Sequence, residues 1–271
     1  MTAGVTSWWL VYPLLGVFAG FVAGLFGVGG GLTLVPFMLM LFAAQGFDTG
    51  NLMHLSLGTS MATIAVTSIS SMRAHHLHAA VRWDIVRNLA PGLLLGTLGG
   101  SLVAGLVPTR PLAISFTAIV YFASLQMILD FKPQPHRGLP GKLAQFGVGT
   151  GIGIVASLVA AGGGFMSIPY MAYCNVAIHK AIGTSAALGF PIAVAGLIGY
   201  VAAGWNAANL PDYSLGYVYL PAFVGVVTFS FLTAPFGARM AHRLPVKQLK
   251  RGFGGFLALL ASKMLYGLLA G

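Results

Sequence analysis

Two glycine clusters, each followed by a proline, are the residues in this sequence best suited to expose backbone donors. Their members are Gly29, Gly30, Gly31 and Pro36 in the first cluster, and Gly162, Gly163, Gly164 and Pro169 in the second. Glycine carries the largest entropic cost in a helix, and proline removes a hydrogen-bond donor. Each cluster therefore predicts a broken helix. Free N–H groups where a helix restarts suit a negatively charged ligand, so we expect these residues to bind an anion.

A second duplicated element adds polar side chains. Its copies span residues 54–60 and 179–185, and the matching side chains are His54, Thr59 and Ser60 with His179, Thr184 and Ser185. The recurrence of the hydroxyl pair predicts contact with a substrate, and hydrogen bonding to a carbonyl one turn earlier in the same helix is the alternative. A protonated histidine could attract an anion or carry a coupling proton. Both histidines are close to the end of an apolar run, so a structural role at the interface is equally compatible.

Other possible chemistries are poorly supported. His75, His76 and His78 could suggest a metal site, but they lie in a basic stretch without a suitably spaced carboxylate or cysteine. We expect them in a solvated loop. The segment 149–153 echoes a dinucleotide loop but lacks a later acidic partner for the ribose, and we assign no role to the single cysteine, Cys174. We therefore predict no catalytic residues, no metal and no cofactor.

The composition is that of a membrane protein. Hydrophobic residues make up 57 % of the 271 residues and charged residues only 7 %, which predicts an all-α polytopic membrane protein. Its net charge of +10 is explained by basic loops on one face of a membrane. No basic module typical of nucleic-acid binding is present. We expect a lipid bilayer as the surroundings and no nucleic-acid partner, and the sequence leaves the oligomeric state open.

Acidic residues are confined to the polar junctions between apolar runs. Glutamate is absent, and the four aspartates are Asp48, Asp84, Asp130 and Asp212. The sequence therefore predicts no carboxylate within the membrane that could serve a proton relay, a sodium site or an aspartyl protease.

The chain is an internal duplication of five apolar runs. The expected runs are Trp8–Val28, Leu32–Ala44, Leu52–Met72, Ile85–Val107 and Leu112–Leu129, then Leu143–Ala161, Phe165–Ala177, Ala181–Ala203, Leu215–Ala238 and Leu249–Ala270. This order predicts a first repeat over 1–130, a linker over 131–142 and a second repeat over 143–271. Within the first run, Gly16, Gly20 and Gly24 have the spacing of a helix-packing stripe.

The basic residues predict that the repeats are inverted. Loops that are basic in one half correspond to neutral loops in the other, and an odd number of segments per half produces this inversion. If the second run returns to the side where the first began, loops on one side hold 12 of the 14 Lys and Arg residues. These basic loops are expected in the cytoplasm and both termini outside.

The second run, Leu32–Ala44, is too short to cross a bilayer. It spans about 20 Å as a helix, against a hydrocarbon core of about 30 Å. Each glycine break is therefore expected at the tip of a helical hairpin that enters part of the membrane. One hairpin enters from each face, and the tips meet near the midplane.

The motif over Gly20–Pro36 reads G-x-x-x-G-L-F-G-V-G-G-G-L-x-x-V-P. Together with its second copy and the paired Gly-Thr-Ser elements, it resembles the TauE/SafE sulfite exporter family over nearly the whole chain. The resemblance implies a permease for sulfur-containing anions: sulfite, sulfoacetate, other organosulfonates or thiosulfate. It implies a place in the bacterial cytoplasmic membrane and does not identify the anion.

Export is the expected direction of transport. An inside-negative potential drives anions outward by about 2.3 kcal/mol per charge per 100 mV, so export needs no coupling ion, and we expect the two hairpin-bearing halves to rock around the site. Proton-coupled uptake through His54 or His179 is the alternative. A membrane-embedded enzyme would need a carboxylate to orient its histidines and hydroxyls, and a scaffold would not explain the duplicated breaks.

Overall fold

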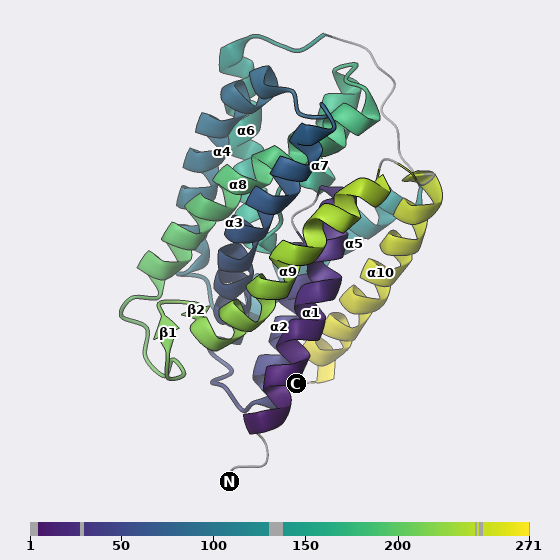
Figure 1. Cartoon of the computed structure of the whole chain (residues 1–271). Helices are drawn as coiled ribbons and strands as arrows, with labels where there is room; N and C mark the ends of the chain where they lie inside the picture. The colour runs from purple at the N-terminus through teal and green to yellow at the C-terminus, as the bar shows by residue number, and fades with distance from the viewer. Residues whose placement is uncertain (1–4, 28–29, 130–137, 242, 244–245, 271) are drawn as a thin grey trace.

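The computed structural model describes residues 5–27, 30–129, 138–241, 243 and 246–270. Within these residues the chain is almost entirely helical, which confirms the predicted all-α class (Figure 1). The helices are α1 (Val5–Phe26), α2 (Gly31–Ala44), α3 (Leu52–Leu77), α4 (Trp83–Ala104), α5 (Thr109–Ile128), α6 (Lys142–Val159), α7 (Gly164–Tyr173), α8 (Ile178–Ala203), α9 (Leu220–Ala241) and α10 (Val246–Ala270). Gly29 and most of the predicted linker lie outside the described residues.

One predicted helical run begins with a β-hairpin instead. Strands β1 (Ser214–Leu215) and β2 (Val218–Tyr219) pair antiparallel, and α9 begins only at Leu220. Gly216 in the turn has a φ of 53°, a left-handed conformation that glycine adopts without strain and that two-residue hairpins require. The apolar residues before α9 therefore satisfy their backbone groups across the hairpin, and the predicted start of this run at Leu215 is wrong.

Helices α3 and α8, each 26 residues long, pack against each other at the centre of the bundle (Figure 1). Gly58, near the start of α3, lies against the Tyr217 carbonyl group beyond the end of α8. Gly183, near the start of α8, lies against the Ala80 carbonyl group beyond the end of α3. The two helices are therefore antiparallel.

The remaining long helices pack in pairs, each with one helix from each half of the chain. Helix α1 packs on α9, α4 on α6, and α5 on α10. Gly16, Gly20 and Gly24 of α1 lie directly against the backbone of α9, which confirms their predicted packing role. Close approach through glycine is a common way for membrane helices to associate. The contacts rise in step along α1 and α9 and along α4 and α6, so both of these pairs run parallel, and each joins a helix of one half to a helix of the other. This matched exchange of partners supports the proposal of two inverted repeats over 1–130 and 143–271.

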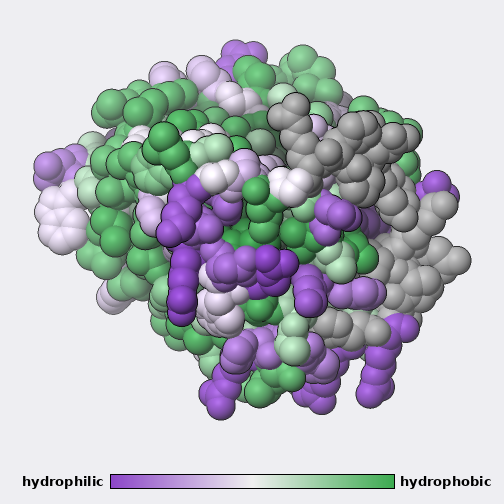
Figure 2. Space-filling view, turned by 90° about the horizontal axis from the view of Figure 1, so that it is seen from above, coloured by the Kyte–Doolittle hydropathy of each residue, from purple (hydrophilic) through white to green (hydrophobic). Residues whose placement is uncertain are grey.

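Length and composition identify a multi-pass membrane protein. Among the described residues, six segments are long and apolar enough to cross a bilayer: α3, α5, α6, α8, α9 and Lys250–Leu269 of α10. Leu10–Phe26 and α2 are shorter apolar helices. The start of α1 and the end of α10 lie at the lower end of the molecule in Figure 1, and the basic starts of α4 and α6 lie at the upper end. Figure 2 shows hydrophilic side chains gathered on that upper end.

The contact between α4 and α6 gives a direct test of this packing. A methyl group at Gly96 would overlap the Thr150 carbonyl oxygen of α6, whereas one at Gly99 would meet nothing within 4 Å. We expect Gly96→Ala to destabilise the protein by about 1–3 kcal/mol through overpacking. Gly99→Ala, in the same helix, should be neutral or stabilise it by up to about 1 kcal/mol. Thermal unfolding in detergent measures both, and equal effects would contradict this packing.

Candidate anion site at the two helix breaks

The two glycine clusters form matching helix starts. Gly30, with a φ of 76°, precedes α2, and Gly163, with a φ of 74°, precedes α7. Both values lie in the left-handed region, where a side chain would add strain. A glycine N-cap also offers no side-chain oxygen to the N–H groups of the first turn. Pro36 and Pro169 lie inside the two short helices rather than at the breaks.

Described residues of the two breaks lie close together. A methyl group at Gly31 would overlap the carbonyl oxygen of Ala160, the residue that ends α6 just before the second break. The Ser185 hydroxyl donates to the carbonyl oxygen of Gly27 at 2.9 Å and accepts from the Ser167 hydroxyl at 3.0 Å. The segment after α1 is thereby joined to both α7 and α8.

The middles of the central helices support the breaks. A methyl group at Gly31 would lie 2.9 Å from Cδ1 of Ile64, halfway along α3. One at Gly189 of α8 would lie 3.7 Å from Cα of Gly162. Gly30, Gly31 and the second cluster, Gly162 to Gly164, are all buried. The breaks are therefore surrounded by protein, as irregular backbone at membrane depth requires.

The two motif threonines accept hydrogen bonds from backbone N–H groups that directly precede other helices. Thr59 accepts a hydrogen bond from the Tyr219 N–H group at 3.0 Å, and Thr184 accepts one from the Arg82 N–H group at 2.9 Å. Both threonines are fully buried. Tyr219 is the last residue of β2, directly before α9, and Arg82 directly precedes α4. The side-chain oxygens thus satisfy N–H groups at helix starts, which lack a partner within the helix. Their contact with a substrate stays a prediction.

The two motif serines differ. Ser185 is held between Ser167 and the Gly27 carbonyl, as described above. The Ser60 hydroxyl is fully buried and has no hydrogen-bond partner among the described residues. The sequence alignment of the motifs could not distinguish these environments, because the difference depends on which side chain faces each serine.

The motif histidines occupy unlike environments. His54 is buried, with Nε2 at 3.0 Å from the Val107 carbonyl oxygen, and its ring stacks on Tyr217 with centroids 4.8 Å apart. His179 is exposed at the start of α8, near the opposite end of the bundle. The contacts of His54 fit the structural alternative, and a coupling role for either histidine stays a prediction.

The prediction that residues 75–78 form a solvated loop is wrong for His75. Helix α3 continues to Leu77, and His75 in its last turn is fully buried with Nε2 at 3.0 Å from the Gly24 carbonyl oxygen. His76 is exposed and accepts a hydrogen bond from Trp83. Among the described residues, no three His, Cys, Asp or Glu side chains are grouped as a metal site would need.

The described aspartates lie outside the helix middles. Asp48 precedes α3, Asp212 follows α8, and Asp84 is in the first turn of α4. Asp84 forms an ion pair with Arg82 at 2.5 Å, and this guanidinium group holds the pKa of the Asp84 carboxyl below its usual value. Asp130 lies outside the described residues.

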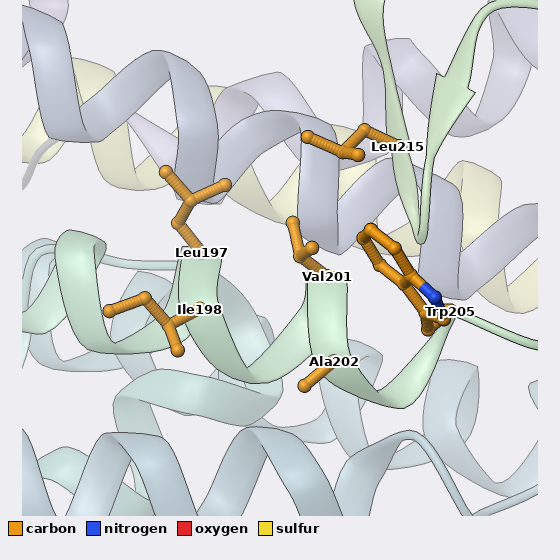
Figure 3. A pocket seen from close by; sticks show the side chains of 6 residues that line it. All are labelled: Leu197, Ile198, Val201, Ala202, Trp205 and Leu215. Carbon is orange, nitrogen blue, oxygen red and sulfur yellow. The ribbon is translucent and has the colours of Figure 1, made fainter.

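A surface pocket of about 560 Å³ lies away from the breaks, at the end of α8 beside the β-hairpin (Figure 3). Its lining is almost entirely apolar and consists of Leu197, Ile198, Val201, Ala202, Trp205 and Leu215. It offers no charged side chain to an anion.

Known proteins match this chain over nearly its whole length. A family model described as "Sulfite exporter TauE/SafE" matches residues 12–264. The chain belongs to the TauE/SafE sulfite exporter family. This TauE/SafE protein is 37 % identical over 257 residues to a "Probable membrane transporter protein" of Haemophilus influenzae, covering 94 % of this chain and 97 % of the relative. It is 24 % identical over 262 residues to one of Methanocaldococcus jannaschii, covering 94 % of this chain and 96 % of that relative.

No solved structure matches this chain. The family and these relatives make it a membrane transporter rather than an enzyme.

The two threonine contacts predict that removing either hydroxyl group lowers the stability of the protein by a similar amount. Thr59→Val and Thr184→Val each remove the acceptor of a helix-start N–H group, so each should destabilise the TauE/SafE protein by about 1–2 kcal/mol. Thr→Ser at either position should restore most of this. Thr63→Val is the control, because the Thr63 hydroxyl bonds only the Thr59 carbonyl oxygen of its own helix. Thermal unfolding in detergent measures the effects, and an equal loss in Thr63→Val would contradict the assignment.

Proposed function

We propose that this TauE/SafE protein exports a small sulfur-containing anion, such as sulfite, sulfoacetate or another organosulfonate. The observation that carries the proposal is the pair of glycine-capped helix starts, α2 and α7, whose breaks approach each other through Gly31 and Ala160. A helix N-terminus directs N–H groups and a positive dipole end toward an anion. Glycine lets the anion approach the backbone closely.

The proposed site comprises the breaks and the motif hydroxyls. Its residues are Gly29, Gly30, Gly31, Pro36, Thr59 and Ser60 from the first half and Gly162, Gly163, Gly164, Pro169, Thr184 and Ser185 from the second. Backbone N–H groups supply charge stabilisation without a full positive charge that would hold the anion too tightly for release. Alternating access then requires the hairpin-bearing bodies to rock around this site.

The basic end of the molecule is the cytoplasmic end in this proposal, and both termini are outside. Arg82, Lys142 and Arg239 belong to this end, whereas Arg110 lies at the other. Basic residues are retained on the cytoplasmic side during insertion. The membrane would be the bacterial cytoplasmic membrane, across which the potential favours outward movement of anions by about 2.3 kcal/mol per charge per 100 mV.

Reconstitution into liposomes tests this function. An inside-negative potential should drive efflux of sulfite or sulfoacetate without a requirement for a proton gradient. Gly30→Leu and Gly163→Leu should reduce the flux at least tenfold, because a side chain at a left-handed N-cap strains the break and blocks its N–H groups. Gly151→Leu is the control, since a methyl group there meets nothing within 4 Å.

Two results would refute parts of this proposal. Intact flux in both break variants would show that the breaks do not bind the anion. Flux that ignores the potential and follows a proton gradient, and that is lost in His54→Gln or His179→Gln, would replace export by proton-coupled uptake.

A further inference from the structure

Helix α3 carries far more buried hydroxyl groups than its partner α8. Its Ser and Thr side chains are all buried, and they are Ser56, Thr59, Ser60, Thr63, Thr67, Ser68, Ser70 and Ser71. In α8 the only Ser and Thr side chains are Thr184 and Ser185. Burying a hydroxyl group in an apolar environment is costly unless it gains a hydrogen bond, so the excess on α3 needs an explanation.

Two of these hydroxyls have no partner. Six of the eight form hydrogen bonds with α9, with the Tyr219 N–H group before α9 or with carbonyl groups of α3 itself. Ser60 and Ser71, which are 0 % and 3 % exposed, have none among the described residues. An unsatisfied buried hydroxyl in a native protein points to a ligand or to a state in which the group is solvated.

Ser60 and Ser71 lie on one face of α3, on either side of the first break. They are 11 residues apart, which is close to three full turns and about 16 Å along the helix. Ile64, which contacts Gly31, lies on the same face between them. Ser60 is therefore on the side where α3 begins, and Ser71 is on the side of the basic end, two residues before the exposed Arg73.

Helix α8 in the second half has no matching pair of unsatisfied hydroxyl groups. Aligning the two Gly-Thr-Ser motifs sets Ser60 against Ser185, whose hydroxyl is already bonded, and Ser71 against Gly196, which packs on Met61. We propose that Ser60 and Ser71 line the route of the anion along α3, between the glycine breaks and the two ends of the protein. This inference rests on the proposed function. It places the route along α3 of the first half and not along α8 of the second, although both halves contain a glycine break.

Serine hydroxyls suit such a route. Each donates one hydrogen bond to a sulfonate or sulfite oxygen without adding a fixed charge, so the anion is held weakly and passes on. In the described conformation these hydroxyls are closed off, and they become accessible when the bodies around α3 rearrange.

Cysteine labelling tests the route. In a Cys174→Ala background, which is free of cysteine, the variants Ser60→Cys and Ser71→Cys are treated in proteoliposomes with an anionic methanethiosulfonate that carries a sulfonate group. The controls are Ser56→Cys and Ser68→Cys, because the native hydroxyls there bond carbonyl groups of α3 itself. We expect labelling at Ser60 and Ser71 to be at least tenfold faster than in the controls and to be slowed by sulfoacetate. Equal labelling at all four positions, or none, would overturn the route.

Alanine variants separate a transport role from a structural one. Ser60→Ala and Ser71→Ala remove unsatisfied hydroxyls, so thermal stability should stay unchanged or rise while the KM for the anion rises about tenfold. Ser56→Ala, equally buried, should leave the KM unchanged. A fall in stability with an unchanged KM would overturn the route.

Anion flux through the wild-type protein is measured in parallel. It distinguishes a failure of the proposed route from a failure of the proposed function. If the labelling pattern is found but no sulfur-containing anion is transported, the route stands and the proposed substrate class fails. If sulfite or sulfoacetate is transported and the pattern is absent, the route fails and the proposed function stands.

Discussion

Backbone groups that leave a helix inside a membrane protein must be enclosed by protein, and this constraint organises the whole fold. The cost of an unpaired N–H group in hydrocarbon is several kcal/mol. Here the breaks before α2 and α7 are buried against the middles of α3 and α8, and Ser185 bonds the Gly27 carbonyl group at one of them. The long antiparallel helices are thus the walls that permit two irregular segments at this depth. The same enclosure leaves N–H groups available where lipid cannot reach them.

Much of this fold could be predicted from the sequence because its signals are local. Long apolar runs that contain almost no charged residues mark the long helices. Gly30 and Gly163 mark the breaks, since only glycine adopts a left-handed φ without strain. Predicted boundaries are wrong where tertiary contacts extend or shorten a run. Helix α3 extends to include His75 because Gly24 of α1 provides a buried acceptor for its ring.

The candidate site was less predictable, because its side chains form hydrogen bonds with residues that are distant in the sequence. Thr59 and Thr184 are 125 positions apart and follow the same motif, yet their partners, Tyr219 and Arg82, could be identified only from the packing of α9 and α4. The difference between Ser60 and Ser185 arises in the same way. Ser167 faces Ser185, and the corresponding residue of the first hairpin, Leu34, has no hydroxyl. The repeated motif therefore specified a repeated backbone and matching threonine contacts, but unlike contacts for its serines.

The glycine-lined contacts between α1 and α9 and between α4 and α6 have a consequence for how the protein can move. Backbones in such close contact cannot slide or separate without losing most of their dispersion energy. Each hairpin is thereby fastened to a helix that the gene encodes in the opposite half, through Gly20 on Ser230 and through Gly96 on Thr150. In the proposed rocking motion, each moving body would therefore combine helices from both halves of the chain, and the hinge is expected between these bodies rather than at the predicted linker. Neither half of the chain can then form its close-packed helix pairs without the other, so separating the halves would expose the glycine-lined faces of α1 and α4.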